Sequence, residues 1–370
     1  MTGSEIGKMK VLLLSYSHIE RDSRVLKHVH FFKKSGYDVT VCGYEMPRNK
    51  RFNLTEKIKY IYNIFVCPEK SVEILYGNLT PQRAKYHIII CNDWNTLPLG
   101  FRIAEKTGAK LVYDSHEMAT RQYGIRMPKW YFLIKPLACF IEKKYIRSAG
   151  LVSAVSPGIV DALRKKYGLD NVMLLRNIPL PVSEGERPGD QKLSNGDIAI
   201  YYHGWVFRHR GIKTLAEAVR RVKHVSLYLR LVGDDQWMRK KYGKDRNIIF
   251  LDPLPPKELG RSLPRFDIGT ALLPPTSFNH IHALPNKFFE YVLNGLPVLA
   301  SEENISMAQL IKKYGLGFVI PRFTLKEMVK FLKSLTRERI NGQKEKLEGS
   351  GYHVSVEEEW MAWIRKIELL

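Results

Sequence analysis

Short apolar runs rich in β-branched residues alternate with longer segments whose apolar residues recur every three or four positions. The short runs are typical of buried parallel strands, and the longer segments of helices with one apolar face. In the first half we expect strands at Lys10–Ser15, Asp38–Cys42, His87–Cys91, Lys110–Tyr113, Gly150–Val155 and Val172–Leu175. We expect helices near Ser23–Lys34, Leu97–Lys106, Pro128–Arg147 and Pro157–Tyr167.

The second half repeats this alternation. Its expected strands are Ile198–Tyr202, Ser226–Val232, Ile248–Leu251, Ile268–Leu272, Leu296–Ala300 and Gly317–Ile320. Its expected helices are Ile212–Lys223, Lys257–Leu263, Asn286–Leu293, Met307–Tyr314 and Leu325–Leu335. Alternating strands and helices with short connections predict parallel sheets covered by helices on both faces. The pattern therefore predicts an α/β protein with two doubly wound, Rossmann-like domains.

The boundary between these domains is expected at Pro179–Asn195, a segment rich in proline, glycine, serine and charge. We therefore expect a first domain at 1–180, a second at 181–350 and a final segment at 351–370. The final segment contains a helical pattern, Val354–Ile367, with tryptophans three residues apart at 360 and 363. Two tryptophans on one helix need a surface against which they can be buried.

The net positive charge of the chain favours negatively charged partners. The chain has 59 Lys and Arg against 37 Asp and Glu, a net charge of +22. Residues 1–180 carry 29 basic and 15 acidic residues, so +14 of that surplus lies in the first half. Nucleic acid, anionic membranes and phosphorylated small molecules would all suit this charge. No zinc-finger spacing, RNP-type aromatic motif or helix-turn-helix signal is present, so no nucleic-acid partner is expected.

Cysteine usage and hydropathy indicate the compartment. The four cysteines form no CxxC pair, which is typical of reduced thiols in the cytosol. Met1–Lys10 is polar and does not have the pattern of a signal peptide. No uncharged apolar stretch reaches the roughly 18 residues that a spanning helix needs. We expect a cytoplasmic protein.

One segment, Arg126–Arg147, interleaves aromatic residues with lysines: RMPKWYFLIKPLACFIEKKYIR. Such a helix could lie on an anionic membrane, with Trp130, Tyr131 and Phe132 inserted among the lipids. It could equally be an ordinary buried helix whose lysines extend to the solvent. The sequence leaves both interpretations open.

Polar and aromatic residues crowd the positions just after the expected strands. Ligands of doubly wound domains bind outside the carboxyl ends of the strands, so these positions predict a site. They include Asp22 and Arg24 after the first strand, Asp93 after the third, and His116 after the fourth. In the second half they include His203 and Gly204. Their clustering predicts a cleft that the two domains face.

The segment VYDSHEM, Val112–Met118, ends a strand with Asp, Ser, His and Glu. Asp114 or Ser115 could cap the next helix, and His116 could act as an acid, a base or a hydrogen-bond donor. His116 and Glu117 could also ligate a metal, but no second expected strand is followed directly by an obvious HxH or ExxH pair. We therefore expect no metal.

Two further segments suit a phosphorylated ligand. In YYHGWVFRHRG, Tyr201–Gly211, Gly204 permits close backbone approach and Arg208 and Arg210 precede a helix. That arrangement suits a diphosphate, although a turn glycine in a basic loop would have the same sequence. In ALPNKFFEYVLNGLPVLAS, a helix starts after Pro285 with Glu290 in its middle. Its N-terminus could bind an anion beside Glu290, or Glu290 could merely pair with Lys287 at the surface.

Several common nucleotide and hydrolase motifs are missing from the sequence. There is no GxGxxG after the first strand, no GxxxxGK[ST] and no GxSxG. Ordinary dinucleotide binding, P-loop phosphate binding and a hydrolase elbow are therefore not supported.

Five segments, in this order, together resemble glycosyltransferase family 4. They are Asp22–Val41, Asn92–Glu117, Ala154–Gly168, Tyr202–Val219 and Leu284–Ser301. The resemblance implies a GT-B fold, in which two Rossmann-like domains face a cleft and the last helix crosses back to the first domain. It also implies a retaining hexosyltransferase that uses a UDP- or GDP-linked sugar as its substrate, without a metal or other cofactor.

The resemblance assigns roles on the donor side. Glu290 matches the second glutamate of the E-x7-E motif, which holds the ribose hydroxyls, and His282 stands where the first glutamate is usual. Arg210 matches the diphosphate-binding lysine, and Arg208 could replace the partner arginine. Backbone N–H groups of three residues at the helix start, next to Pro285, would meet the phosphates. They belong to Leu284, Asn286 and Lys287.

On the acceptor side, His116 resembles the first-domain histidine near the donor sugar and the leaving group. Asp22 and Arg24 occupy the region of the family's first loop, with Asp93 nearby. We expect transfer to a lipid-linked or surface-polysaccharide acceptor by a peripheral protein on the inner face of the plasma membrane. Alternatives are a nucleic-acid-binding protein, an inactive scaffold, or an epimerase or phosphorylase on the same fold.

Overall fold

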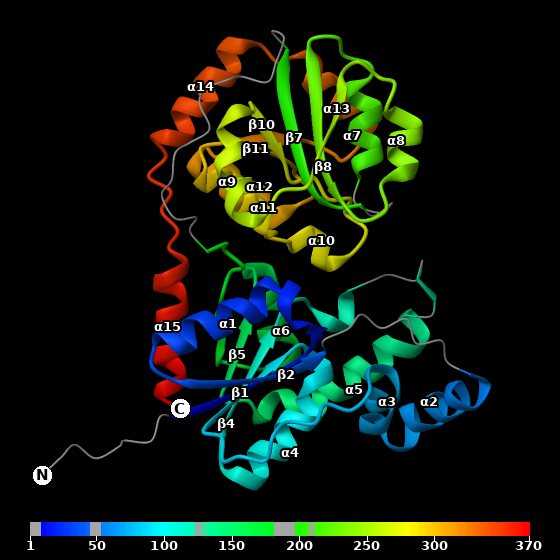
Figure 1. The fold of residues 1–370 in the computed structure, drawn as a ribbon, viewed down its shortest axis with the longest axis vertical. Helices are drawn as coiled ribbons and strands as arrows, with labels where there is room; N and C mark the ends of the chain where they lie inside the picture. The colour runs from blue at the N-terminus through cyan, green and yellow to red at the C-terminus, as the bar shows by residue number, and fades with distance from the viewer. Residues whose placement is uncertain (1–8, 45–52, 123–126, 129, 181–196, 207–210) are drawn as a thin grey trace, which may run out of the picture. The chain divides into compact units, whose positions relative to one another are not determined.

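The chain divides into two compact units. A computed structural model describes residues 9–44, 53–122, 127–128, 130–180, 197–206 and 211–370. Unit 1 comprises Met1–Asn177, Ser277–Asn279 and Ser355–Leu370, and unit 2 comprises Ile178–Thr276 and His280–Val354 (Figure 1). Most of the expected boundary segment, Pro179–Asn195, lies outside the described residues.

Unit 1 contains a six-stranded parallel sheet with the order β2-β1-β3-β4-β5-β6. Its strands are β1 (Lys10–His18), β2 (Asp38–Tyr44), β3 (Ile88–Asn92), β4 (Lys110–Ser115), β5 (Leu151–Ala154) and β6 (Val172–Leu174). The helices on its chain are α1 (Ser23–Lys34), α2 (Leu54–Val66), α3 (Pro68–Tyr76), α4 (Leu97–Thr107), α5 (Lys135–Tyr145), α6 (Pro157–Tyr167) and α15 (Val356–Glu368).

The strands of unit 1 are buried on both faces. Leu12 and Leu14 belong to a core cluster that includes Ile141 of α5, and both are completely buried. Their neighbours Val11 and Leu13 are also completely buried, and successive strand side chains point to opposite faces. Helices therefore cover both faces, which is why these strands are continuous apolar runs.

Unit 2 contains a second six-stranded parallel sheet, with the order β12-β11-β10-β7-β8-β9. Its strands are β7 (Ile198–Trp205), β8 (Val225–Val232), β9 (Ile248–Leu251), β10 (Ile268–Thr270), β11 (Val298–Ser301) and β12 (Gly317–Ile320). The helices on this part of the chain are α7 (Ile212–Val219), α8 (Gln236–Tyr242), α9 (Pro256–Ser262), α10 (Phe278–His282), α11 (Asn286–Leu293), α12 (Ile305–Tyr314), α13 (Leu325–Lys333) and α14 (Arg337–Glu348).

The expected fold class, two doubly wound Rossmann-like domains, is confirmed by these sheets. Several helices were not expected from the sequence: α2, α3, α8, α10 and α14. The expected strand from Leu296 instead begins at Val298, because Leu296 donates its N–H to the Tyr291 carbonyl and completes the turn after α11. Among the described residues, no helix has the length and apolar content needed to span a membrane.

The expected single helix at 128–147 is interrupted. A π-helical turn, η4 (Trp130–Ile134), leads into α5, where Pro136 occupies the first turn and so loses no helical hydrogen bond. Trp130 is buried, whereas Phe132 is 63% exposed. Of the two interpretations that the sequence left open for this segment, membrane insertion does not fit Trp130, because this side chain packs inside unit 1.

Helix α15 packs on α1 within unit 1. Trp360 and Trp363 are completely buried. The Trp360 ring stacks on Phe31 with 5.2 Å between centroids, and the Trp363 ring lies 5.8 Å from Phe32. Hydrogen bonds reinforce this contact, since the Tyr37 hydroxyl donates to a Glu368 carboxylate oxygen at 2.7 Å.

We expect Trp363→Ala to lower the free energy of unfolding of unit 1 by about 3–5 kcal/mol, because it removes a large buried side chain and leaves a cavity. Urea unfolding followed by circular dichroism measures this change. Leu26→Ala is the matched control, since Leu26 lies on α1 but is 44% exposed. A loss no larger than that of the control would show that the Trp363 side chain is not packed against α1.

Candidate functional site

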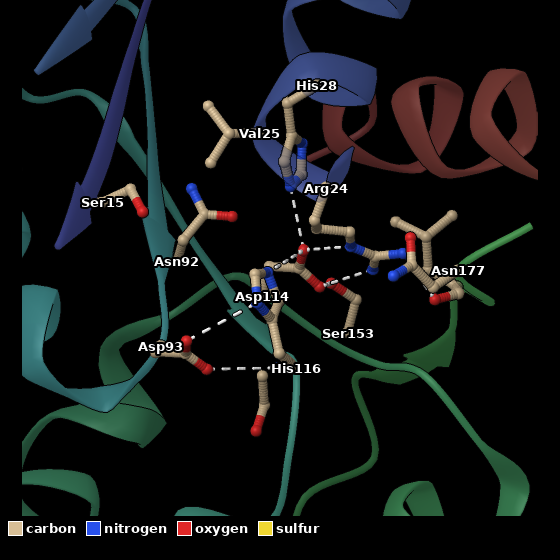
Figure 2. Close-up of polar contacts among 12 residues, drawn as sticks. Ser15, Arg24, Val25, His28, Asn92, Asp93, Asp114, His116, Ser153 and Asn177 are labelled. Carbon is tan, nitrogen blue, oxygen red and sulfur yellow. Dashed lines mark hydrogen bonds and ion pairs between the residues drawn. The ribbon is translucent and has the colours of Figure 1, made fainter. Parts of the chain in front are cut away.

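A buried carboxylate organises the carboxyl end of the sheet in unit 1 (Figure 2). Asp114, near the end of β4, is completely buried. Its two oxygens accept from Arg24 Nε at 2.7 Å and Arg24 Nη2 at 2.8 Å. The Ser153 hydroxyl donates to it at 2.6 Å, and His28 Nε2 lies 2.8 Å from it. One carboxylate thus joins α1, β4 and β5.

Burial and neighbouring groups determine the protonation states of Asp114 and His28. Burial would raise the pKa of Asp114, but the Arg24 guanidinium and the hydrogen bonds hold that pKa well below its usual range. Burial lowers the pKa of His28 to about 4, which outweighs the effect of Asp114. The cluster therefore contains one buried ion pair and a neutral imidazole that donates through Nε2.

Arg24 has no surface with which to meet an acceptor, since it is 1% exposed. Its Nη1 donates to the carbonyls of Leu175 at 2.9 Å and Arg176 at 3.2 Å. This differs from the expected acceptor-side position, because the guanidinium is used inside the fold. The neighbouring Asp22 is half-buried and caps α1, accepting from the N–H groups of Arg24 and Val25 at 2.9 and 3.2 Å.

His116 follows β4 and lies between two carboxylates. Its Nδ1 is 3.5 Å from Asp93, and its Nε2 is 3.6 Å from Asp114. Burial would lower the pKa of His116, but the carboxylates of Asp93, Asp114 and Asp22 raise it to about 9. His116 is therefore an imidazolium at neutral pH, and 22% of its side chain is exposed.

Asp93 has an unusual backbone. Its φ of 63° is the one positive value at a non-glycine position within the described parts of the chain. Such a conformation costs free energy, and residues that adopt it cluster at functional sites. Its carboxylate faces His116 and also accepts the His116 backbone N–H at 3.3 Å. The strained residue thus presents a partly exposed carboxylate beside a cationic imidazole.

In unit 2, Glu290 of α11 meets His203 of β7. The His203 Nε2 lies 2.7 Å from a Glu290 carboxylate oxygen, and the Tyr291 hydroxyl lies 3.1 Å from His203 Nδ1. Burial lowers the pKa of His203, although the bond to Glu290 opposes this. A neutral His203 fits both contacts, donating through Nε2 to Glu290 and accepting from the Tyr291 hydroxyl at Nδ1. Glu290 keeps 23% of its side chain exposed.

Lys287 of α11 adds a positive charge next to His203 and Tyr202. Its Nζ donates to the His203 carbonyl at 2.9 Å and lies 4.0 Å from the centroid of the Tyr202 ring. Gly204 has φ +135°, and a Cβ there would lie 3.2 Å from Lys287 Nζ. Gly204 therefore allows the backbone of β7 to pass close to this ammonium group. At 7% exposure, Lys287 is not part of an open surface pair.

The start of α11 lies beside this ammonium. Pro285 is the N-cap, and it provides no side-chain cap for the helix. Leu284, before it, is buried, and Asn286 is the first helical residue. An uncapped helix N-terminus carries a partial positive charge that attracts anions. The carboxyl end of β7 therefore combines a lysine, a helix start and a carboxylate.

The sequence predicts three further residues in this site. His282 ends α10 and is half-buried. Arg208 and Arg210 lie outside the described residues. Within the described chain, no three His, Cys, Asp or Glu side chains form a group suited to a metal.

Sequence reasoning did not pair Glu290 with His203 or Tyr291. Available signals were the position of His203 at a strand end and the adjacency of Tyr291 to Glu290. These signals indicate that His203 and Tyr291 lie near Glu290, but they do not show which nitrogen or hydroxyl contacts the carboxylate.

A family profile matches most of the first unit. Residues 32–177 match the family profile of a glycosyl transferase 4-like domain. No curated protein sequence matches the chain significantly.

Solved structures with the same fold cover both units. Sucrose-phosphate synthase from Thermosynechococcus elongatus is 13% identical, with a TM-score of 0.69 over 98% of this chain and 100% of the other. Anabaena Alr3699/HepE, in complex with UDP-glucose, is 14% identical, with a TM-score of 0.62 over 96% and 99%. The lipopolysaccharide outer core galactosyltransferase WaaB is 13% identical, with a TM-score of 0.61 over 96% and 99%. The fold is therefore GT-B.

We expect His116→Gln to flatten the alkaline part of the stability profile. A histidine whose pKa rises from 6.5 to about 9 on folding stabilises the fold fully below pH 6.5 and loses that contribution as the pH rises through 9. The wild type should lose up to about 3 kcal/mol more than the variant across this range. Urea unfolding at several pH values measures it.

His30→Gln, which removes an exposed imidazole from α1, is the control for this measurement. Parallel alkaline profiles for the wild type and His116→Gln would show that His116 is not the protonated group.

Proposed function

Because the chain carries a glycosyl transferase 4-like domain on a GT-B fold, we propose that it transfers a hexosyl group from a nucleoside diphosphate sugar to an acceptor hydroxyl. The donor is UDP- or GDP-linked, and the anomeric configuration is retained. The observation that carries this proposal is the arrangement of Glu290, His203 and Lys287 at the start of α11. HepE, which has the same fold, is described in complex with UDP-glucose.

Glu290 is the residue to which we assign the ribose. A carboxylate can accept hydrogen bonds from two neighbouring hydroxyls, and Glu290 is partly exposed. The neutral His203 donates to one carboxylate oxygen at 2.7 Å and fixes its orientation. Tyr291, which contacts Nδ1 of the same ring, in turn orients His203. Glu290 is thus positioned before the donor binds.

The diphosphate is assigned to the start of α11 and to Lys287. In the reaction the bond between the anomeric carbon and the phosphate oxygen breaks, and negative charge grows on the departing nucleoside diphosphate. The Lys287 ammonium and the helix N-terminus would stabilise this charge. We assign Arg208 and Arg210 to the same diphosphate, and His282 to the donor sugar.

Unit 1 is where we place the acceptor. Asp22, Asp93 and His116 offer two carboxylates and an imidazolium at the carboxyl end of its sheet. These groups can accept from, and donate to, sugar hydroxyls. The +14 charge of residues 1–180 suits a lipid-linked or surface-polysaccharide acceptor at the inner face of the plasma membrane. WaaB, of the same fold, is described as a lipopolysaccharide galactosyltransferase.

We expect UDP or GDP to raise the melting temperature of the wild type, since a ligand at 100 times its Kd adds about 2.7 kcal/mol to stability. Glu290→Gln should weaken binding of that nucleotide about tenfold or more, because the amide loses a charged acceptor. Glu302→Gln is the matched control in unit 2, since Glu302 is exposed and pairs with Lys312. No stabilisation by any nucleoside diphosphate, or an equal shift in Glu290→Gln, would refute the donor site.

His203→Ala should raise KM for the donor about tenfold, with a smaller effect on kcat, because it removes the group that orients Glu290. His203→Gln should recover part of this loss, since its amide can still donate to Glu290. Steady-state kinetics with the sugar nucleotide stabilised by the wild type measures both constants. If Ala and Gln behave alike, or if only kcat falls, His203 does not position Glu290.

A further inference from the structure

Helix α2 presents to the solvent an apolar stripe that is interrupted only by Thr55 in its first turn. Six of its side chains are between 45% and 83% exposed. They are Leu54, Ile58, Ile61, Tyr62, Phe65 and Val66. At about 100° per residue they occupy a sector about 140° wide. Scattered exposed apolar residues are ordinary, but a contiguous stripe of this kind marks an interaction surface.

The opposite side of α2 already anchors the helix to unit 1. Tyr60 and Ile64 are buried there. The Ser71 hydroxyl of α3 donates to the Tyr60 carbonyl at 3.0 Å, and the Tyr60 hydroxyl donates to the Leu133 carbonyl at 3.4 Å. The helix therefore has two apolar sides, and only the narrower one is used by the fold. The broader side remains available for a partner.

Charge identifies the kind of partner. Lys57 and Lys59 are exposed and fall at the two borders of the stripe, about 100° to either side of its centre. The helix's one acidic residue, Glu56, accepts from the backbone N–H of Asn53 at 3.1 Å in a capping box. Lysines flanking an apolar face suit a bilayer with anionic head groups, which attract the ammonium groups while the apolar residues enter the acyl boundary.

We infer that α2 lies flat on an anionic membrane and inserts this stripe, Leu54–Val66, between the lipids. A second copy of the chain fits less well, because two lysine-bordered stripes would bring like charges together. The inference gives a surface to the proposed peripheral location and rests on that part of the proposed function. It places the membrane contact on α2 and not around Trp130, which is buried.

The test is binding of the full chain to sedimenting vesicles of phosphatidylcholine with phosphatidylglycerol, and to vesicles of phosphatidylcholine alone. The wild type should bind the anionic vesicles more strongly. Ile58→Ser with Phe65→Ser should weaken this binding about tenfold or more, because two inserted side chains are lost. Lys57→Glu with Lys59→Glu should reduce the preference for anionic lipid by a similar factor.

Controls separate insertion from damage to the fold. The substituted residues are exposed, so the melting temperature and the nucleotide-induced shift should stay as in the wild type. Leu26→Ser removes an exposed leucine from α1 and should leave vesicle binding unchanged.

Three outcomes would overturn the inference: no binding of the wild type to anionic vesicles, equal binding by the Ile58 and Phe65 double variant, or loss of a wild-type dimer in that variant. The dimer result, seen by sedimentation velocity, would name a second copy as the occupant. Because nucleotide binding is measured on the same samples, a negative result for membrane binding does not decide the transferase proposal, which has its own test.

Discussion

The ion pair between Arg24 and Asp114 connects the elements that meet at the carboxyl end of the sheet in unit 1. Two charges removed from water are costly unless hydrogen bonds satisfy their remaining donors and acceptors. Here Asp114 accepts from Arg24, His28 and Ser153, while Arg24 also donates to carbonyls after β6. The guanidinium lies 5.1 Å from the centroid of the Trp360 ring. Contacts of this one ion pair therefore connect helix α1, strands β4 and β5, the chain beyond β6 and helix α15.

Two histidines show how environment decides protonation at these strand ends. Both His116 and His203 touch carboxylates, and burial disfavours the charged form of each. Three aspartates surround His116 and keep it charged, whereas a single glutamate does not outweigh burial at His203. One imidazole is therefore a cation between two carboxylates. The other is a neutral donor that fixes a neighbouring carboxylate.

Periodicity and turn residues were enough to predict the architecture. Helices α1, α6 and α11 begin and end where the sequence predicted, since prolines or polar residues mark their starts and Ser, Gly or Asn follows each end. Helix α2 was missed because apolar residues on two sides obscure the simple pattern of one buried face. The burial of Arg24 could not be predicted, because its partner Asp114 is 90 residues away. The sequence also placed Glu290 in the middle of a helix, without revealing that His203 holds its carboxylate.

The return of α15 to unit 1 affects the order in which the protein can be made. The aromatic surface of α1, with Phe31 and Phe32, is synthesised early, but the tryptophans that cover it lie near residue 360. Domains generally fold as units during synthesis, and exposed apolar surface on an incomplete domain promotes aggregation. On the ribosome, unit 1 must therefore wait with this surface open while all of unit 2 is translated. During that interval the exposed aromatic surface of α1 is a binding site for chaperones.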